Sequence, residues 1–126
     1  IVDNASGSDI GKKIAKYGLQ YVGNKYVYGG TSLTNGVDCS GFTYRVYEAF
    51  GYTLPRTSYA QRSAGRAVDY ADAQPGDLIM YSGHVGIYIG DGQIVHASNS
   101  KPYPKGGIKV NKATYRKIIG VRRIVD

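Results

Sequence analysis

The sequence contains a single cysteine, only two histidines and no long hydrophobic run. One cysteine excludes a disulfide within the chain, and one cysteine with two histidines falls short of a closed four-ligand zinc site unless carboxylates or water complete it. No apolar stretch approaches the roughly 20 residues that cross a bilayer, so we expect no transmembrane segment. Without a disulfide or a membrane-spanning segment, we expect the chain to fold around its own hydrophobic core.

Size and composition predict one globular domain. The 126 residues are 42% hydrophobic and 20% charged, which is ordinary for a folded protein and excludes a disordered chain. The chain does not begin with Met, and its first residues look like a linker. We therefore expect residues 1–8 to be a linker from an upstream module and residues 9–126 to be the domain, with any export signal lying upstream.

Basic residues outnumber acidic ones by 16 to 9, which gives a formal net charge of +7. Such a protein is attracted to polyanions, including nucleic acid, anionic lipid and other anionic polymers. The basic residues are scattered, with only Lys12-Lys13 and Arg122-Arg123 adjacent, and no nucleic-acid-reading motif accompanies them. We therefore expect no nucleic-acid partner.

The first half of the chain predicts helices. Apolar residues recur at helical spacing over residues 9–22 and 39–50, and each run is followed by a glycine that stops a helix. Ser58 and Gln61 form a capping box, which predicts a short third helix ending near Gly65.

The second half predicts strands. Short runs rich in Ile, Val and Tyr, separated by Gly, Asp, Asn and Pro, occur over residues 77–81, 84–89, 93–97, 108–110 and 119–124. Helices followed by an antiparallel sheet, here of about five to six strands, are the α+β arrangement.

Cys39 stands where the second predicted helix begins. The backbone N–H groups of a first helical turn are unpaired and carry partial positive charge, which favours a thiolate there. A lone cysteine is often a small buried hydrophobe instead, but the polar neighbours Asp38 and Ser40 are poor company for a core residue. The position therefore indicates a nucleophile.

A thiolate nucleophile needs an imidazole partner, and both histidines fall in predicted strands. His84 and His96 help each other only if their strands pair in a register that puts them on one sheet face. A two-residue loop of Asp91-Gly92 would put His96 on the wrong face, whereas a three-residue loop over residues 90–92 would place it opposite Gly86, diagonal to His84. We expect the three-residue loop, and Gly86 leaves space for the rings.

Six sequence blocks occur in order along the chain: Tyr26–Gly30, Val37–Phe42, Leu54–Ser58, Gln74–Leu78, His84–Gly90 and His96-Ala97. Together they resemble the NlpC family of cell-wall cysteine peptidases. The resemblance implies a papain-like α+β domain with N-terminal helices packed on a C-terminal antiparallel sheet. It also implies that Cys39 attacks the substrate, His84 is the base and His96 is the polar third member.

The resemblance extends to the surroundings of the nucleophile. It implies that Tyr28 stands beside it, where the phenol and the Cys39 backbone N–H could hold an oxyanion. Further residues that it implies line or support the cleft are Asp38, Ser40, Arg56 and Ser58. Local alternatives are helix caps for Asp38 and Ser58 and a solvated charge for Arg56. The loop over residues 101–107 has no family signature and could border the cleft.

The resemblance implies hydrolysis of the stem peptide of peptidoglycan, commonly between D-glutamate and the next diamino acid, through an acyl-enzyme and without a metal or organic cofactor. Alternatives with the same thiol are a muramoyl-L-alanine amidase and an acyl transferase. A non-enzymatic module that binds anionic wall polymers and a zinc site at Cys39, His84 and His96 are further alternatives. We expect a monomeric domain within a larger chain that is secreted or associated with the bacterial cell wall.

Overall fold

The computed structural model describes all residues, 1–126. Its α-helices are α1 (Asp9–Leu19), α2 (Cys39–Glu48) and α3 (Ser58–Gln61). Its strands are β1 (Thr31–Ser32), β2 (Gly36–Val37), β3 (Arg66–Ala67), β4 (Leu78–Tyr81), β5 (His84–Gly90), β6 (Gln93–Ser98), β7 (Gly107–Lys112) and β8 (Gly120–Arg123). Two 3₁₀ turns are η1 (Tyr70–Asp72) and η2 (Ala113–Tyr115). None of the helices has the length and hydrophobicity needed to span a lipid bilayer.

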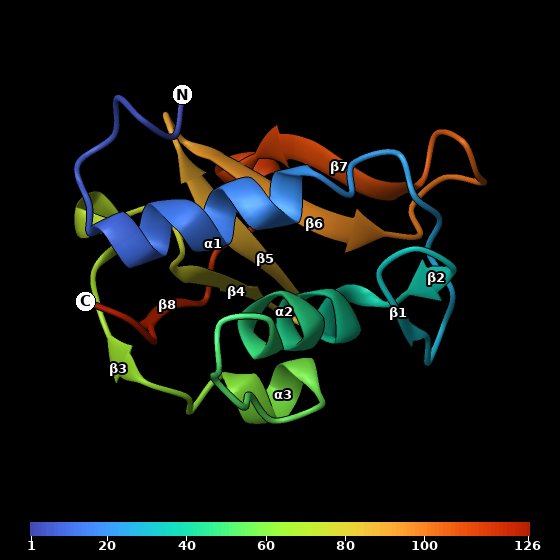
Figure 1. The fold of residues 1–126 in the computed structure, drawn as a ribbon, viewed down its shortest axis with the longest axis horizontal. Helices are drawn as coiled ribbons and strands as arrows, with labels where there is room; N and C mark the ends of the chain where they lie inside the picture. The colour runs from blue at the N-terminus through green and yellow to red at the C-terminus, as the bar shows by residue number, and fades with distance from the viewer.

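A six-stranded antiparallel sheet in the order β3-β8-β4-β5-β6-β7 carries the core, and α1 and α2 lie across one face of it (Figure 1). The main core between helices and sheet includes Ile14, Phe42, Val85, Ile87 and Val95. The other face carries a smaller apolar cluster of Ile79, Tyr81, Ile94, Ala113 and Val121. The predicted α+β class, with N-terminal helices on a C-terminal sheet, is confirmed.

Side-chain caps fix where the helices begin. The Ser8 hydroxyl accepts a hydrogen bond from the Gly11 N–H at 3.1 Å at the start of α1. The capping box predicted at Ser58 is wrong, because Thr57 is the N-cap of α3 and its hydroxyl accepts the Ala60 N–H at 3.1 Å. Ser58 is then the first helical residue and lies within the helix that it was expected to cap.

The pairing of β5 with β6 decides how the histidines meet. Ile87 pairs with Val95, so Gly86 lies opposite His96 in the predicted register. A Cβ atom at Gly86 would lie 3.2 Å from the His96 Cβ atom and closer still to the Ile94 side chain. The absence of a side chain at Gly86 is therefore what lets the two strands carry an imidazole ring at this point.

The loop that produces this register differs from the predicted one. Gly90 pairs with Gln93, so the loop holds only Asp91 and Gly92, whose φ angles are 53° and 70°. Such two-residue turns match the twist of the strands that they connect. A β-bulge between Tyr88 and Gly90 supplies the register shift that the three-residue loop was expected to supply. The two histidines therefore lie on one face of the sheet, as predicted, but the β-bulge and not the loop length puts them there.

Candidate active site

Cys39 is the first residue of α2, as predicted, and its side chain is half-buried. Asp38 is the N-cap of this helix, and its Oδ1 accepts the Gly41 N–H at 2.7 Å. Burial and the Asp38 carboxylate raise the pKa of the Cys39 thiol, and backbone hydrogen bonds from Val85, Ser40 and Cys39 itself lower it by less. The expectation that the helix start favours a thiolate is therefore wrong for the resting protein: burial outweighs the helix start, and the thiol needs a base to become a nucleophile.

The Cys39 sulfur contacts the backbone of Val85, the residue that follows His84, at the beginning of β5. His84 is the first residue of β5 and is 8% exposed. Helix α2 and strand β5 pack against each other. The structure therefore brings the start of α2, with Cys39, to the start of β5, with His84, from segments 45 positions apart in the sequence.

A chain of hydrogen bonds runs away from this point through the sheet. His84 Nε2 lies 2.7 Å from His96 Nδ1, and His96 Nε2 lies 2.7 Å from Asn111 Oδ1. Because an amide oxygen only accepts, His96 must carry its proton on Nε2 and offer a bare Nδ1. His84 must then donate from Nε2, which leaves its Nδ1 lone pair free to take a proton. Asn111 thus sets both tautomers, and the sequence analysis missed it.

Both histidines are neutral near pH 7. Burial, the neighbouring His96 and Arg116 lower the pKa of His84 to about 3. Burial lowers the pKa of His96 to about 4, although the hydrogen bond with Asn111 acts in the opposite direction. A neutral imidazole accepts a proton and an imidazolium does not, so this environment keeps His84 in the form that a general base requires.

Stability should fall with acidity because of these two histidines. The unfolded chain binds protons on both below its ordinary pKa of about 6.5, whereas the folded chain binds them only below about 4 and 3. The free energy of unfolding should therefore drop by about 2 kcal/mol per histidine between pH 7 and pH 5. Urea unfolding at both pH values tests this. A His84→Gln/His96→Gln variant should lose this part of the pH dependence; an unchanged dependence contradicts the assignment.

Asn111 should act through His96. Replacing it by Leu leaves the buried His96 Nε2–H without an acceptor, which should lower the free energy of unfolding by about 1–3 kcal/mol and the rate of catalysis by about tenfold. Asn111→Asp keeps the acceptor and should restore most of the stability, while its charge raises the pKa of His96. An NMR titration of the imidazole protons measures the pKa of His96 in the wild type and in the Asn111→Asp variant. Identical titrations in wild type and Asn111→Asp would contradict the contact.

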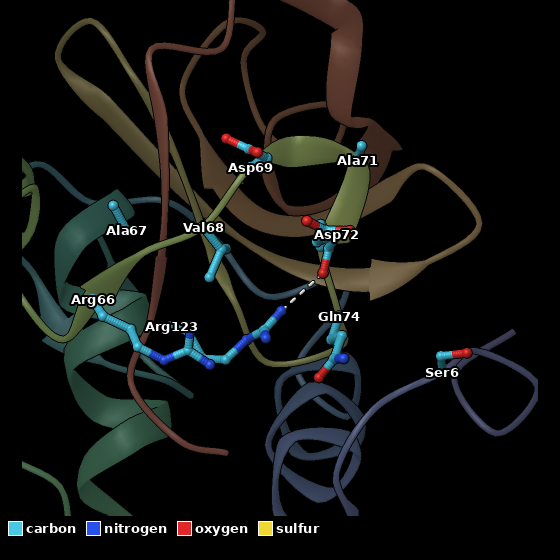
Figure 2. A pocket seen from close by; sticks show the side chains of 10 residues that line it. Ser6, Arg66, Ala67, Val68, Asp69, Ala71, Asp72, Gln74 and Arg123 are labelled. Carbon is cyan, nitrogen blue, oxygen red and sulfur yellow. Dashed lines mark hydrogen bonds between the residues drawn. The ribbon is translucent and has the colours of Figure 1, made fainter.

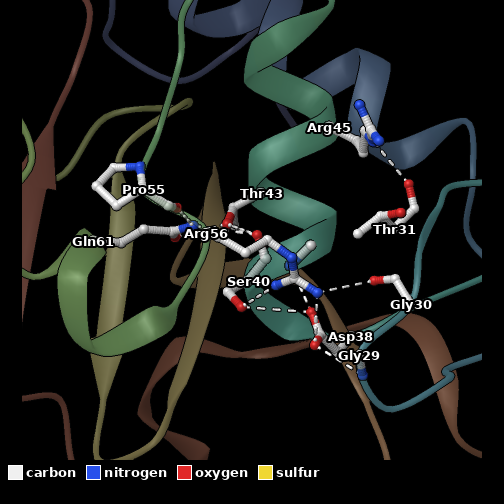
Figure 3. Close-up of polar contacts among 11 residues, drawn as sticks. Gly29, Gly30, Thr31, Asp38, Ser40, Thr43, Arg45, Pro55, Arg56 and Gln61 are labelled. Carbon is white, nitrogen blue, oxygen red and sulfur yellow. Dashed lines mark hydrogen bonds and ion pairs between the residues drawn. The ribbon is translucent and has the colours of Figure 1, made fainter.

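A polar cluster holds the loop before the nucleophile (Figure 3). Asp38 Oδ2 accepts hydrogen bonds from Arg56 Nη2 at 3.0 Å and from the Gly29 N–H at 3.1 Å. Arg56 Nη1 donates to the Ser40 hydroxyl at 2.8 Å, and Nη2 lies 3.3 Å from the Gly30 carbonyl oxygen. Asp38 and Arg56 form an ion pair. The predicted residues Asp38, Ser40 and Arg56 are thus brought together around the start of α2.

Gln61 braces the same helix from behind. Its buried side chain lies 2.7 Å from the Thr43 hydroxyl and donates from Nε2 to the carbonyl oxygens of Ser40 and Pro55, at 3.2 and 2.8 Å (Figure 3). These bonds tie α3 and the link before it to the first turn of α2. Gln61 therefore supports α2 and does not take the capping role that the sequence suggested for it.

The tyrosines are placed differently from the expectation. Tyr28 is 89% exposed, and Ser58 is half-buried outside the Asp38–Arg56 cluster. Tyr26 forms a bridge with Val37, two positions before the nucleophile. The pKa of the Tyr26 phenol is raised by burial and then by Cys39 and Asp38. Tyr26 is therefore the less exposed of the two tyrosines and is bonded to the segment that leads to Cys39, two residues before the predicted tyrosine in the same Tyr-Val-Tyr block.

Tyr115 was also missed. Its ring packs against His96, with 5.3 Å between centroids, and against Tyr81 at 5.4 Å. It comes from η2, after the last strand that the sequence analysis connected with the site. Tyr115 covers the outer side of the histidine pair and contributes to the burial that lowers the histidine pKa values.

The largest cavity lies elsewhere. Its volume is about 720 Å³, and its lining includes Ser6, Arg66, Asp69, Asp72 and Arg123 (Figure 2). Arg123 is already held there by Asp77 and by the Asp72 carbonyl oxygen. Neither the cysteine nor a histidine reaches this cavity. No group of three His, Cys, Asp or Glu side chains is placed to hold a metal ion, so the zinc alternative has no ligand set.

Comparison with known proteins finds a matching family and relatives along most of the chain. A model of the NlpC/P60 family matches residues 23–118. Murein DD-endopeptidase MepS/Murein LD-carboxypeptidase of Escherichia coli (strain K12) is 41% identical over 98 residues, 73% of this chain and 52% of that protein. Gamma-D-glutamyl-L-lysine dipeptidyl-peptidase of Bacillus cereus is 40% identical over 67% of this chain and 27% of its own length.

A solved structure agrees with these relatives. The peptidoglycan hydrolase RipB from Mycobacterium tuberculosis superimposes with a TM-score of 0.77 and 32% identity, over 96% of this chain and 69% of that one. The chain spans about half the length of the Escherichia coli relative. The similarity thus covers nearly the whole of this chain and one part of the longer proteins.

Proposed function

The chain belongs to the NlpC/P60 family, and we propose on that basis that it is a cysteine endopeptidase that hydrolyses the stem peptide of bacterial peptidoglycan. Its fold is the papain-like α+β domain of that family. The observation that supports the proposal most is the meeting of Cys39, at a helix start, with the hydrogen-bonded series His84, His96 and Asn111.

The groups suggest the following reaction. His84 Nδ1 takes the thiol proton as the sulfur attacks the scissile carbonyl carbon. The oxyanion that forms is held by the backbone N–H of Cys39, with the Tyr26 phenol as a second donor in place of the more exposed Tyr28. The protonated His84 then gives its proton to the leaving amine, and an acyl-enzyme remains on the sulfur.

Water completes the reaction. His84, again neutral, takes a proton from a water molecule that attacks the acyl carbon; the acyl–sulfur bond then breaks, and the protonated His84 returns its proton to the departing sulfur, which regenerates the thiol and releases the carboxylic acid. His96 holds the ring of His84 throughout, because its Nδ1 accepts the His84 Nε2 proton. The scheme uses the residues of this chain alone and consumes one water per bond.

For the bond itself we propose the one between D-glutamate and the following diamino acid. The name of the Bacillus cereus relative contains this linkage, whereas the name of the Escherichia coli relative specifies a DD-endopeptidase. Incubation with defined muropeptides and mass spectrometry of the products distinguishes the outcomes. A free amine on the diamino acid supports the proposal. Release of muramic acid from L-alanine identifies the amidase, and an amine adduct identifies the transferase.

We further propose that the domain works outside the cytoplasm, secreted or associated with the bacterial cell wall, where this substrate lies. Stem peptides carry carboxylates, so the positive net charge of +7 would attract them. Fractionation of the producing cells, with an antibody against the domain, tests this location.

A further inference from the structure

The positive charge of the chain is concentrated in its last 35 residues. Residues 1–91 contain eight basic and eight acidic residues, whereas residues 92–125 contain eight basic residues and no acidic one. Arg122 and Arg123 of this segment are occupied by backbone carbonyls and by Asp77. The remaining six take part in none of the five ion pairs of the structure: Lys101, Lys105, Lys109, Lys112, Arg116 and Lys117.

Two of these six cations flank the histidine pair. Lys109 of β7 is the cross-strand partner of His96 and therefore shares its face of the sheet. Arg116 follows Tyr115, which packs on His96, and lies over the Tyr81 ring at 5.8 Å. Arg116 donates to the Ser82 carbonyl oxygen at 2.8 Å and Lys109 to the Ser100 hydroxyl at 3.4 Å, but no carboxylate forms an ion pair with either, so the β6–β7 side of the site presents positive charge that is not neutralised. On the helix side, by contrast, Arg56 is already paired with Asp38.

A third cation lines a pocket at the end of this side. The pocket has a volume of about 330 Å³ and lies between Tyr26 and the β6–β7 loop, from which Asn99, Lys101 and Tyr103 contribute. The Ile108 N–H donates to the Asn24 carbonyl oxygen at 2.8 Å, and the Gly23 N–H donates to the Ile108 carbonyl oxygen at 2.9 Å, which joins the two walls. Figure 1 shows this loop on the same side of the molecule as the segment that follows α1. Tyr26 also forms a bridge with Val37, two residues before Cys39, so this wall of the pocket is joined to the segment that carries the nucleophile.

The pocket has a lysine in its wall, and the β6–β7 loop that forms most of this wall contains no acidic residue. Such a pocket near the nucleophile is suited to an anionic group of the substrate. We propose that this pocket is a carboxylate subsite and that Lys101 makes the domain select stem peptides with a free carboxylate next to the scissile bond. The proposal rests on the proposed function for the identity of the substrate. Lys109 and Arg116 add positive electrostatic potential, which attracts the carboxylate to the β6–β7 side of the site.

Binding to a Cys39→Ala variant tests the subsite without turnover. The probes are D-glutamyl–diamino acid peptides in which each of the two carboxylates flanking the bond is either free or converted to the amide. Calorimetry should show that one of the two amidations weakens binding about tenfold, which corresponds to about 1.4 kcal/mol. The difference should shrink at high salt, since the charges are exposed to solvent.

Variants at Lys101 test whether this residue causes the preference for the free carboxylate. In the Cys39→Ala background, Lys101→Ala should abolish the preference for the free acid, and Lys101→Arg should keep it. Lys13→Ala, on the exposed surface of α1, is the matched control and should change nothing. Equal affinities for acid and amide, no binding of either, or a preference that survives Lys101→Ala would overturn the subsite.

The proposed function fails in a different way. Wild-type protein that prefers the free acid in binding but cleaves neither peptide would contradict the peptidase and leave the subsite standing. Cleavage of acid and amide with equal kcat/KM would contradict the subsite alone. The KM, and not kcat, should carry the difference, because a subsite that holds the carboxylate equally well in the ground state and in the transition state acts on binding alone.

Discussion

Cys39→Ala should lower kcat/KM for muropeptide cleavage by about 10⁴-fold or more. Removing the nucleophile of a catalytic unit leaves only the contribution of oxyanion stabilisation and substrate binding. The effect should be on kcat, because the cleft that binds the peptide is unchanged. Product formation followed by chromatography, with the same substrate at several concentrations, gives both constants.

The fold should tolerate this change. Cys39 is half-buried at the first position of α2, where Asp38 supplies the cap and alanine is a good helix former. The circular dichroism spectrum and the urea midpoint should therefore match those of the wild type. Cys39→Ser is a closer match in size and should be almost as inactive, because a hydroxyl is a weaker nucleophile than a thiol. Retained cleavage in a folded Cys39→Ala variant would contradict the proposed reaction.

His84→Gln should lower kcat by about 10³–10⁴-fold, and His96→Gln by only about 10²-fold. His84 exchanges protons with the sulfur, the leaving amine and water, whereas His96 only holds the His84 ring and its tautomer through one hydrogen bond of 2.7 Å. Steady-state kinetics of both variants at pH 7 measure the order.

The double variant gives a sharper test of the arrangement. Since His96 acts through His84, its replacement should cost nothing further once His84 is gone, and the two losses should not multiply. His84→Gln/His96→Gln should therefore be as slow as His84→Gln alone. Equal losses in the two single variants, or losses that multiply in the double one, would show that His96 has an independent role.

Much of this site could be predicted from local sequence. A helix start is marked by a cap and by apolar periodicity, so Cys39 was placed correctly at the first position of α2. Alternation along strands and the need for one shared face placed His96 opposite Gly86. These features depend on residues within a few positions of one another.

The errors come from features that local pattern does not encode. A β-bulge and a shorter loop give the same register as a longer loop without a bulge, so the sequence could not separate the two. Asn111 was missed because Asn and Lys are poor strand formers, and the predicted strand ended at residue 110, whereas β7 continues to Lys112. Thr57 and Ser58 are both good caps, and only the path of the chain decides between them.

The charged side of the cleft also needed the fold. The sequence shows an excess of basic residues after residue 91, but not which of them lie near the site. Antiparallel pairing places Lys109 beside His96, and the β6–β7 loop brings Lys101 to Tyr26. Their meeting depends on long-range pairing, which single-sequence periodicity does not contain.

Alkylation of the single cysteine tests the central claim most directly. Because the chain has one thiol, iodoacetamide modifies Cys39 alone, and intact mass spectrometry measures the modified fraction. Activity on a stem peptide should fall in proportion to that fraction and reach zero at one equivalent, and bound substrate should slow the modification. Hydrolysis that persists in fully alkylated protein would contradict the account.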